Sequence, residues 1–267
     1  MQVRPSIRRA TAYALIVVAG LWPLPAPAAD SLRAVPFVFI GKAGDCGPPT
    51  AGSHIVTAAW LGGMGLPDTD GDAALNGVPA TADDPHRGLL LSKNGPSTDC
   101  SSAGARITGV KGMTVDAAFT LGFDYRNGGH CGAGAPRFNV VAKPPTGPNT
   151  FHFVGGCANA ASTPAPQDPA EWSRVRFAAA QQFPPIPPGS KIVSITILYD
   201  EGTEVATAQD PNGVGLAVVD NIFVNGEDIR TGTGVADGTG GARSDDKHDK
   251  PGHGDDNNDD NNQGNGD

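Results

Sequence analysis

Charged, amide and aromatic side chains recur at alternate positions in four strand-like runs between residues 117 and 177. Alternate residues of a β-strand share one face of its sheet, so each run directs these side chains to the same side. Aromatic rings pack on the C–H faces of sugars, and arginine forks bind hydroxyl or carboxylate oxygens in pairs. We therefore predict a glycan-binding face formed by Asp124, Arg126, Arg137, Asn139, His152, Trp172, Arg174 and Arg176.

The predicted face depends on the register of a hairpin formed by residues 137–154, which has a turn rich in proline and glycine. A turn centred between Thr146 and Gly147 pairs Val141 with His152. In that register His152 lies on the outer side of the hairpin with the other polar residues. A glycan, acidic or neutral, is the ligand that this arrangement favours.

Trp172 is the aromatic residue of the predicted face. The segment before it, residues 158–170, is rich in proline and alanine and is predicted to be neither helix nor strand. Single aromatic residues are common on protein surfaces. The alternative interpretation is therefore a solvated outer face on which the segment 158–170 covers Trp172.

Carboxylates that could bind a cation lie in the loop-like region 62–87, at Asp68, Asp70 and Asp72. Alternating short carboxylates are ligands that calcium prefers. The match to an EF-hand loop is partial, because a third acidic position before the glycine and a glutamate six residues after it are both missing. Aspartate, asparagine and glycine are equally typical of solvated turns. A structural Ca²⁺ is thus one interpretation and a solvated loop is the other, and no other cofactor is predicted.

Catalytic motifs of the nucleophile-elbow, zinc-helix, Walker and Rossmann types are missing from the sequence. A glycosidase needs only two acids that the fold brings together, and the candidate acids are Asp124, Asp200, Glu201 and Glu204. His130 precedes Cys131, which is a pattern that a cysteine nucleophile with a histidine base could use. A disulfide at this cysteine is favoured in an exported protein.

The four cysteines are an even number, which indicates two disulfides in an exported chain. The hairpin of residues 137–154 returns to the edge from which it starts, so Cys131 is predicted to pair with Cys157. Cys46 then pairs with Cys100 by elimination. A zinc site is the competing use of four cysteines, but no two of them have the close spacing that a closed zinc site usually needs.

The N-terminal residues 1–29 combine three arginines, an apolar run and an Ala-x-Ala motif, a pattern typical of a cleaved signal peptide. The apolar run is shorter than the roughly 20 residues that span a bilayer. We expect the protein to be secreted or periplasmic, without a membrane span after cleavage. At the other end, residues 231–267 are mostly Gly, Asp and Asn and are predicted to be a disordered tail.

Between these ends, residues 30–230 contain many short alternating runs separated by Gly, Pro, Asn and Asp. This pattern predicts a single all-β domain, a jelly-roll-like antiparallel β-sandwich with long loops. Alternation places the following residues in its core: Leu121, Phe123, Tyr125, Phe138, Val140, Phe151, Phe153, Val175, Phe177, Val193, Ile195 and Ile197.

The run Leu-Ala-Val-Val-Asp-Asn-Ile-Phe-Val-Asn-Gly at residues 216–226 resembles the closing strand of jelly-roll, galactose-binding-like and carbohydrate-binding-module families. The run Ile-Thr-Ile-Leu-Tyr-Asp-Glu-Gly at residues 195–202 is similar to the strand before it. The resemblance implies a secreted, non-catalytic module that binds carbohydrate or another extracellular polymer. An extracellular hydrolase of polysaccharides or esters is the alternative, and a structural surface protein is the third. The net charge of −9 argues against nucleic acid and anionic membranes as partners.

Overall fold

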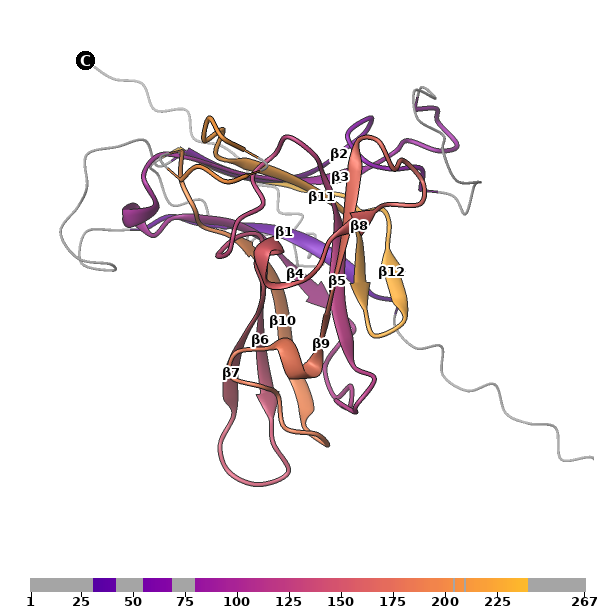
Figure 1. Cartoon of the computed structure of the whole chain (residues 1–267), viewed down its shortest axis with the longest axis vertical. Helices are drawn as coiled ribbons and strands as arrows, with labels where there is room; N and C mark the ends of the chain where they lie inside the picture. Colours follow the sequence, from indigo (N-terminus) through magenta and orange to yellow (C-terminus); the bar gives the residue numbers. More distant parts are fainter. Residues whose placement is uncertain (1–30, 42–54, 69–79, 204, 209, 240–267) are drawn as a thin grey trace, which may run out of the picture. The chain divides into compact units, whose positions relative to one another are not determined.

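The computed structural model describes residues 31–41, 55–68, 80–203, 205–208 and 210–239, and within them it contains thirteen β-strands, three short 3₁₀-helices and no α-helix (Figure 1). The strands are β1 (Arg33–Phe39), β2 (Ile55–Leu61), β3 (Gly88–Asn94), β4 (Ser102–Thr108), β5 (Thr120–Arg126), β6 (Arg137–Lys143), β7 (Thr150–Gly155), β8 (Thr163–Pro164), β9 (Trp172–Ala178), β10 (Lys191–Tyr199), β11 (Leu216–Val224), β12 (Glu227–Ile229) and β13 (Val235–Thr239). The 3₁₀-helices are η1 (Ser97–Asp99), η2 (Cys157–Asn159) and η3 (Ala179–Gln181).

The strands form two antiparallel sheets. A five-stranded sheet has the order β1-β4-β10-β6-β7, and a larger sheet has the order β13-β2-β3-β11-β5-β9-β8, with β12 also paired with β11. The chain passes repeatedly from one sheet to the other, so strands that are adjacent in a sheet are often distant in sequence. The predicted all-β antiparallel sandwich is therefore confirmed.

One hydrophobic core is shared by the two sheets. Phe123 on β5 of the larger sheet contacts Phe138 on β6 of the five-stranded sheet, with ring centroids 5.8 Å apart. Aromatic pairs at this separation add to the stabilisation from buried area. Most residues predicted for the core are buried in it, namely Leu121, Phe123, Tyr125, Phe138, Val140, Val175, Phe177, Ile195 and Ile197.

The predicted core face of β7 is wrong. Val140 pairs with His152 and Asn139 with Phe153, one residue away from the predicted register. A shift of one residue exchanges the two faces of a strand. His152 is consequently buried, whereas Phe153 and its neighbour Phe151 are 44% and 46% exposed.

Buried His152 has a hydrogen-bonding partner on each side of its ring. Its Nδ1 lies 2.7 Å from the carbonyl oxygen of Pro184, and its Nε2 lies 2.7 Å from the hydroxyl of Thr150. A buried imidazole with both nitrogens satisfied costs little to keep in a core. A histidine can therefore face the core, and its polarity alone does not indicate on which face of the strand it lies.

A second difference lies at the start of β10. Its pairing with β6 is shifted between Ile192 and Ser194, which is a β-bulge. A bulge adds one residue to a strand and changes the face of the residues before it. Ile192 is buried for this reason, and the predicted core residue Val193 is only partly buried.

The folded region extends beyond residue 230, the predicted end of the domain. β13 pairs with β2 along five residue positions, from Val235 opposite Ala59 to Thr239 opposite Ile55. Residues 235–239 thus belong to the larger sheet and not to a tail, because a short strand needs only backbone hydrogen bonds to extend a sheet edge. The segment 158–170 also contains structure, namely part of η2 and the two-residue strand β8.

The predicted disulfide between Cys131 and Cys157 is confirmed, with Cα atoms 5.3 Å apart. It joins the loop before β6 to the loop after β7, as the hairpin argument required. Cys100 is also disulfide-bonded. Its predicted partner Cys46 lies outside the described residues.

Candidate functional site

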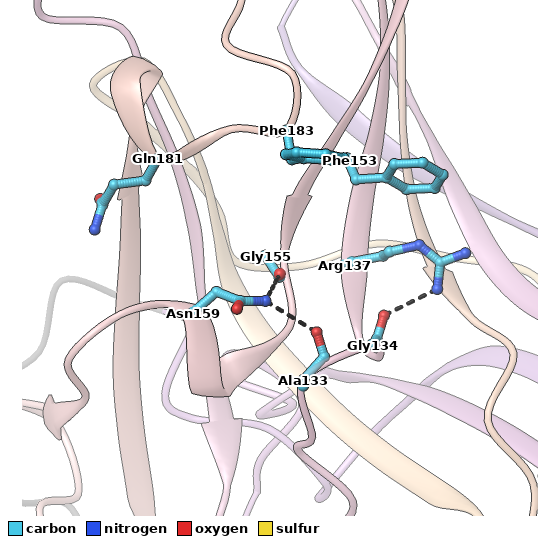
Figure 2. A pocket seen from close by; sticks show the side chains of 8 residues that line it. All are labelled: Ala133, Gly134, Arg137, Phe153, Gly155, Asn159, Gln181 and Phe183. Carbon is cyan, nitrogen blue, oxygen red and sulfur yellow. Dashed lines mark hydrogen bonds between the residues drawn. The ribbon is translucent and has the colours of Figure 1, made fainter.

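A cavity of about 640 Å³ opens at the outer edge of β7, beside the segment that contains Phe183. Figure 2 shows that its walls come from the loop before β6, from the ends of β6 and β7, and from the segments around η2 and η3. We call this cavity the Phe153 pocket, and it is lined by Ala133, Gly134, Arg137, Phe153, Gly155, Asn159, Gln181 and Phe183.

Two phenylalanines of the Phe153 pocket are held by a short backbone ladder. The amide of Phe153 donates to the carbonyl of Phe183 at 2.7 Å, and the amide of Phe183 donates to the carbonyl of Phe153 at 2.8 Å. The ladder ends there because Pro184 and Pro185 have no N–H to donate. Phe183 is 76% exposed, so its ring is available to a ligand.

The ring of Phe151 lies edge-on to that of Phe153, with centroids 5.0 Å apart. Phe151 is one of the exposed residues on the same outer face of β7. Exposing three large aromatic rings in one place forfeits stabilisation that burial would provide. Such a group of rings is typical of a surface that contacts something else.

Arg137 forms the polar wall of the Phe153 pocket. Its guanidinium binds both carboxylate oxygens of Asp200, each at 2.6 Å, and donates to the carbonyl of Gly134 at 2.9 Å. Its Nε donates to Asn139 at 3.2 Å. The guanidinium carbon lies 5.4 Å from the centroid of Phe153, within the range of a cation–π contact. Arg137 is thus fixed before any ligand arrives.

Two amide side chains complete the pocket. Asn159 uses its Nδ2 to donate to the carbonyl oxygens of Ala133, at 2.9 Å, and of Gly155. Gln181 accepts a hydrogen bond from the amide of Ala178 with its Oε1, at 2.9 Å. Among the described residues neither the oxygen of Asn159 nor the nitrogen of Gln181 has a partner, so the pocket offers one acceptor and one donor.

The glycine-rich loop before β6 allows its neighbours to come this close. A Cβ on Gly156 would lie 1.8 Å from the carbonyl oxygen of Ala133, and the φ angle of Gly156 is +69°. A Cβ on Gly134 would lie 2.2 Å from a carboxylate oxygen of Glu201. Only glycine fits at position 156, because the atom that a side chain would meet there is backbone. At Gly134, within the Gly-His-Cys-Gly-Ala-Gly-Ala-Pro run, the absence of a side chain leaves room for the carboxylate of Glu201.

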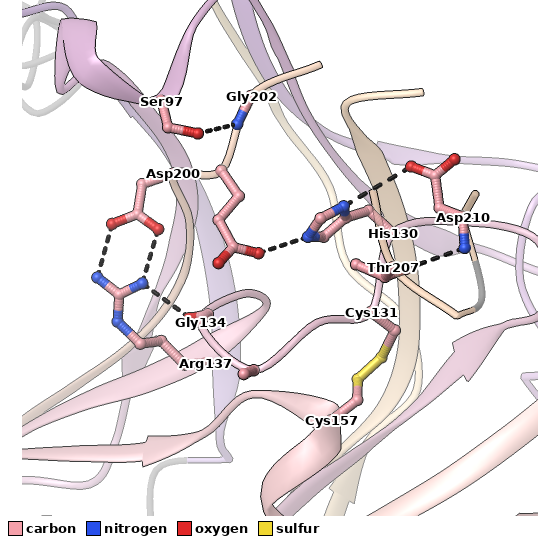
Figure 3. A network of polar contacts seen from close by, with 12 residues as sticks. Ser97, His130, Cys131, Gly134, Arg137, Cys157, Asp200, Gly202, Thr207 and Asp210 are labelled. Atoms are coloured by element: carbon pink, nitrogen blue, oxygen red, sulfur yellow. Dashed lines mark hydrogen bonds and ion pairs between the residues drawn. A yellow bond between two sulfur atoms is a disulfide. The ribbon is translucent and has the colours of Figure 1, made fainter. Parts of the chain in front are cut away.

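A polar network lies behind the pocket, around buried His130 (Figure 3). The Nε2 of His130 lies 2.5 Å from a carboxylate oxygen of Glu201, and its Nδ1 lies 3.6 Å from a carboxylate oxygen of Asp210. The ring of Tyr199 stands edge-on to the imidazole at 5.4 Å. The sulfur of the neighbouring residue Cys131 is in a disulfide, so the predicted pattern for a cysteine nucleophile is not formed.

Asp210 fixes the loop that precedes β11. Its carboxylate accepts from the amide of Val214 at 2.7 Å, and its carbonyl accepts from the amide of Thr207 at 2.9 Å. His130 therefore connects this loop to Glu201 at the end of β10. The network therefore positions two loops. The candidate acid Glu201 contacts His130 within the network, and the candidate acid Asp200 binds Arg137 beside it. Glu204 lies outside the described residues.

The eight residues predicted for a glycan-binding face are divided between the two sheets. Arg137, Asn139 and His152 are in the five-stranded sheet, and the other five are in the larger one. Only Arg137 and Asn139 are brought together on one exposed side, because His152 is buried. The strands carrying the two groups are not neighbours, so the single predicted face does not exist.

On the larger sheet, Asp124 is fully buried on β5. Both its oxygens accept from Arg174, at 2.7 and 2.8 Å, and it also binds Arg176 at 3.3 Å and Asn221 at 2.7 Å. The hydrogen bond to Asp124 raises the pKa of Arg174, whereas burial lowers the pKa of Arg176. The predicted Arg126 is exposed at the end of β5. The charges of Asp124, Arg174 and Arg176 satisfy one another.

Trp172 is buried as well. It packs in a small cluster with Leu66, Ala165 and Val218, and the amide of Ala165 donates to its carbonyl at 2.9 Å. Ala165 belongs to the segment 158–170, so the alternative interpretation of a covered tryptophan is confirmed for this residue.

The predicted calcium loop is described only at Asp68. Its carboxylate accepts from the amide of Arg87 at 3.3 Å, and its own amide donates to Asp84 at 2.8 Å. Burial raises the pKa of Asp68 to about 6. Asp70 and Asp72 lie outside the described residues. No group of three or more possible metal ligands occurs within the described part of the chain, so calcium binding stays a prediction.

Phe153 and Phe183 were missed as site residues. Phe153 was assigned to the core through the hairpin register, and Phe183 follows a stretch without alternation. The turn of the hairpin is centred on Thr146, because Ala142 pairs with Thr150. The prediction centred the turn between Thr146 and Gly147, half a residue further along the chain, and this difference shifts the register by one residue.

Comparison with known proteins gives no family and no relative for this chain: no family model matches it, and no curated protein does. No helix among the described residues is long and apolar enough to cross a membrane.

Proposed function

We propose that this protein is a secreted binding module for carbohydrate and that the sugar binds in the Phe153 pocket. The observation that carries the proposal is the pair of exposed phenylalanine rings, Phe153 and Phe183, on the rim of a pocket whose other side chains are a guanidinium and two amides. Sugars have apolar C–H faces and a hydroxyl edge. Aromatic rings suit the faces, and amide groups suit the hydroxyls.

The site is rigid in a way that favours binding. The backbone ladder fixes both phenylalanines, and Asp200 with the carbonyl of Gly134 fixes Arg137. Groups that are already ordered lose little conformational entropy when a ligand arrives. The disulfide between Cys131 and Cys157 restrains the pocket loops and supports an oxidising compartment outside the cytosol.

The test is glycan binding by the mature protein and by two single variants. A glycan array identifies a ligand, and affinity electrophoresis in gels containing the corresponding polysaccharide measures retention. We expect Phe153→Ala and Phe183→Ala each to weaken binding by about tenfold. Both side chains are exposed, so thermal unfolding should change little.

Phe39→Ala is the matched control. Phe39 is a phenylalanine of similar exposure to Phe153, at the end of β1 on the opposite edge of the same sheet. It should keep wild-type retention. Retention that survives in both pocket variants, or that Phe39→Ala reduces as strongly, would overturn the assignment of the pocket.

A further inference from the structure

The Phe153 pocket continues into an exposed row that crosses the five-stranded sheet. Phe153 pairs with Asn139, Asn139 with Thr196, Thr196 with Arg106, and Arg106 with Val35. Residues directly opposite each other in antiparallel strands point to the same face. These five residues therefore form one line from β7 to β1, which we call the Arg106 row.

The strands of the five-stranded sheet carry basic residues without acidic ones. None of the five strands β1, β4, β6, β7 and β10 contains an aspartate or glutamate, and together they contain three arginines and two lysines. The strands of the larger sheet contain both signs, with five acidic and four basic residues. The whole chain has a net charge of −9. A basic sheet in an acidic protein produces a local positive potential that attracts anions.

Arg106 is a cation of this face that is open to a ligand. It is exposed in the middle of β4, and among the described residues no carboxylate pairs with it. Arg137 differs, because Asp200 neutralises its guanidinium. A guanidinium with free N–H groups binds a carboxylate in a bidentate manner.

Resting on the proposed function, we propose that the ligand is an acidic polysaccharide, with one sugar in the Phe153 pocket and the carboxylate of another sugar on Arg106. β4 and β7 are three strand spacings apart, which is about 14 Å. One sugar ring does not cover that length, so the ligand is a chain of several sugars. The chain runs across the strands along the Arg106 row, and Asn139 and Thr196 lie beneath it.

Single-stranded nucleic acid is the other polymer that combines rings with negative charge. Such polymers are bound by grooves that follow each phosphate with cations, and affinity depends on many of these contacts. The Arg106 row contains one arginine. Widely spaced carboxylates on a neutral backbone fit this face better.

The experiment compares acidic polysaccharides with their carboxyl-reduced forms, using polygalacturonate, alginate and hyaluronate as probes. Arg106→Gln should weaken binding of the preferred acidic polymer by about tenfold and leave binding of the reduced polymer unchanged. Arg106→Lys should retain part of the affinity, because it keeps the charge without the fork. Added salt should weaken binding of the acidic form only.

Arg126→Gln is the control, since Arg126 is also exposed but lies on the larger sheet. Equal binding of acidic and reduced polymers, or full affinity in Arg106→Gln, would show that the ligand is not recognised by its carboxylates. Phe153→Ala separates this result from failure of the pocket itself, because a neutral ligand would still depend on Phe153. Tighter binding of oligo-dT than of any acidic polysaccharide, lost in Arg106→Gln, would assign the row to nucleic acid and overturn the proposal.

Discussion

On the larger sheet, Arg174 and Arg176 bind the buried Asp124, whereas on the five-stranded sheet Arg106 is exposed and Arg137 lies over the ring of Phe153. All four arginines are on strands and have alternating apolar neighbours. What differs is the element above them. Residues 62–68 pack against the larger sheet and β8 extends its edge beside β9, while the outer face of the other sheet carries exposed aromatic side chains.

The covered side is held together by its own polar groups. The carboxylate of Asp220 accepts from the amide of Leu66 at 2.7 Å, which ties the loop of residues 62–68 to β11. Its other oxygen accepts from the amide of Asn221 at 2.6 Å. Arginines on such a side contribute to stability. An arginine becomes a candidate for binding where the fold places it at a pocket, as with Arg137, or on an open face, as with Arg106.

The largest expected difference between the two sides is in the aromatic residues. Trp172→Ala should lower the free energy of unfolding by about 4 kcal/mol, because it leaves a cavity beside Leu66 and Val218. Phe153→Ala should change that free energy by less than about 1 kcal/mol and reduce glycan retention instead. Urea unfolding and affinity electrophoresis on both variants measure the two effects. A stable Trp172→Ala protein that fails to bind would return this residue to the ligand site.

The ion pairs of the two sides should differ next. Asp124→Ala leaves the half-buried Arg174 and Arg176 and the buried Asn221 without their shared acceptor, and we expect a loss of about 3 kcal/mol. Asp200→Ala breaks a pair that is 16% and 30% exposed, and it should cost about 1 kcal/mol. Equal losses in urea unfolding would contradict the distinction between a covered and an open side.

The smallest effect is a dependence of stability on pH that comes from the covered side. Burial raises the pKa of Asp68 to about 6 and raises that of Asp220 well above its ordinary value. The unfolded chain loses these protons near pH 4, so between pH 4 and 6 the native state binds more protons than the unfolded state. The free energy of unfolding should therefore fall as the pH rises through this range.

Asp68→Asn removes one of the two carboxyl groups whose pKa burial raises. The free energy of unfolding of this variant should therefore fall less steeply between about pH 4 and 6. Urea unfolding at half-unit steps of pH measures it. A variant whose stability follows the wild-type curve throughout this range would show that Asp68 is not the group responsible. The open side has no carboxylate in its strands, so Arg106→Gln should leave the curve unchanged.

Much of the fold could be predicted because it depends on local chemistry. Period-two alternation identified most of the core, since a sheet residue next to Leu121 or Ile195 has to point away from it. The pairing of Cys131 with Cys157 followed from one hairpin. Short strands separated by Gly, Pro and Asn indicate an antiparallel all-β class, whatever the order of the strands in the sheets.

The candidate site could not be predicted in the same way, because it depends on register and on sheet order. The hairpin of β6 and β7 has a loop that allows two registers with nearly the same centre, and the choice between them exposes Phe153 or His152. Phe183 reaches the pocket through a backbone contact across 30 residues of sequence.

The sequence by itself determined the all-β class, the hairpin disulfide and the residues that alternate into the core, because each depends on neighbours along the chain. Only the tertiary structure decided that Asp124 and Trp172 are covered while Phe153 and Arg106 are open. The physical reason is that exposure depends on which segment packs above a strand. Residues 62–68 reach the larger sheet through contacts distant in sequence, such as that of Leu66 with Asp220, and no local pattern records them.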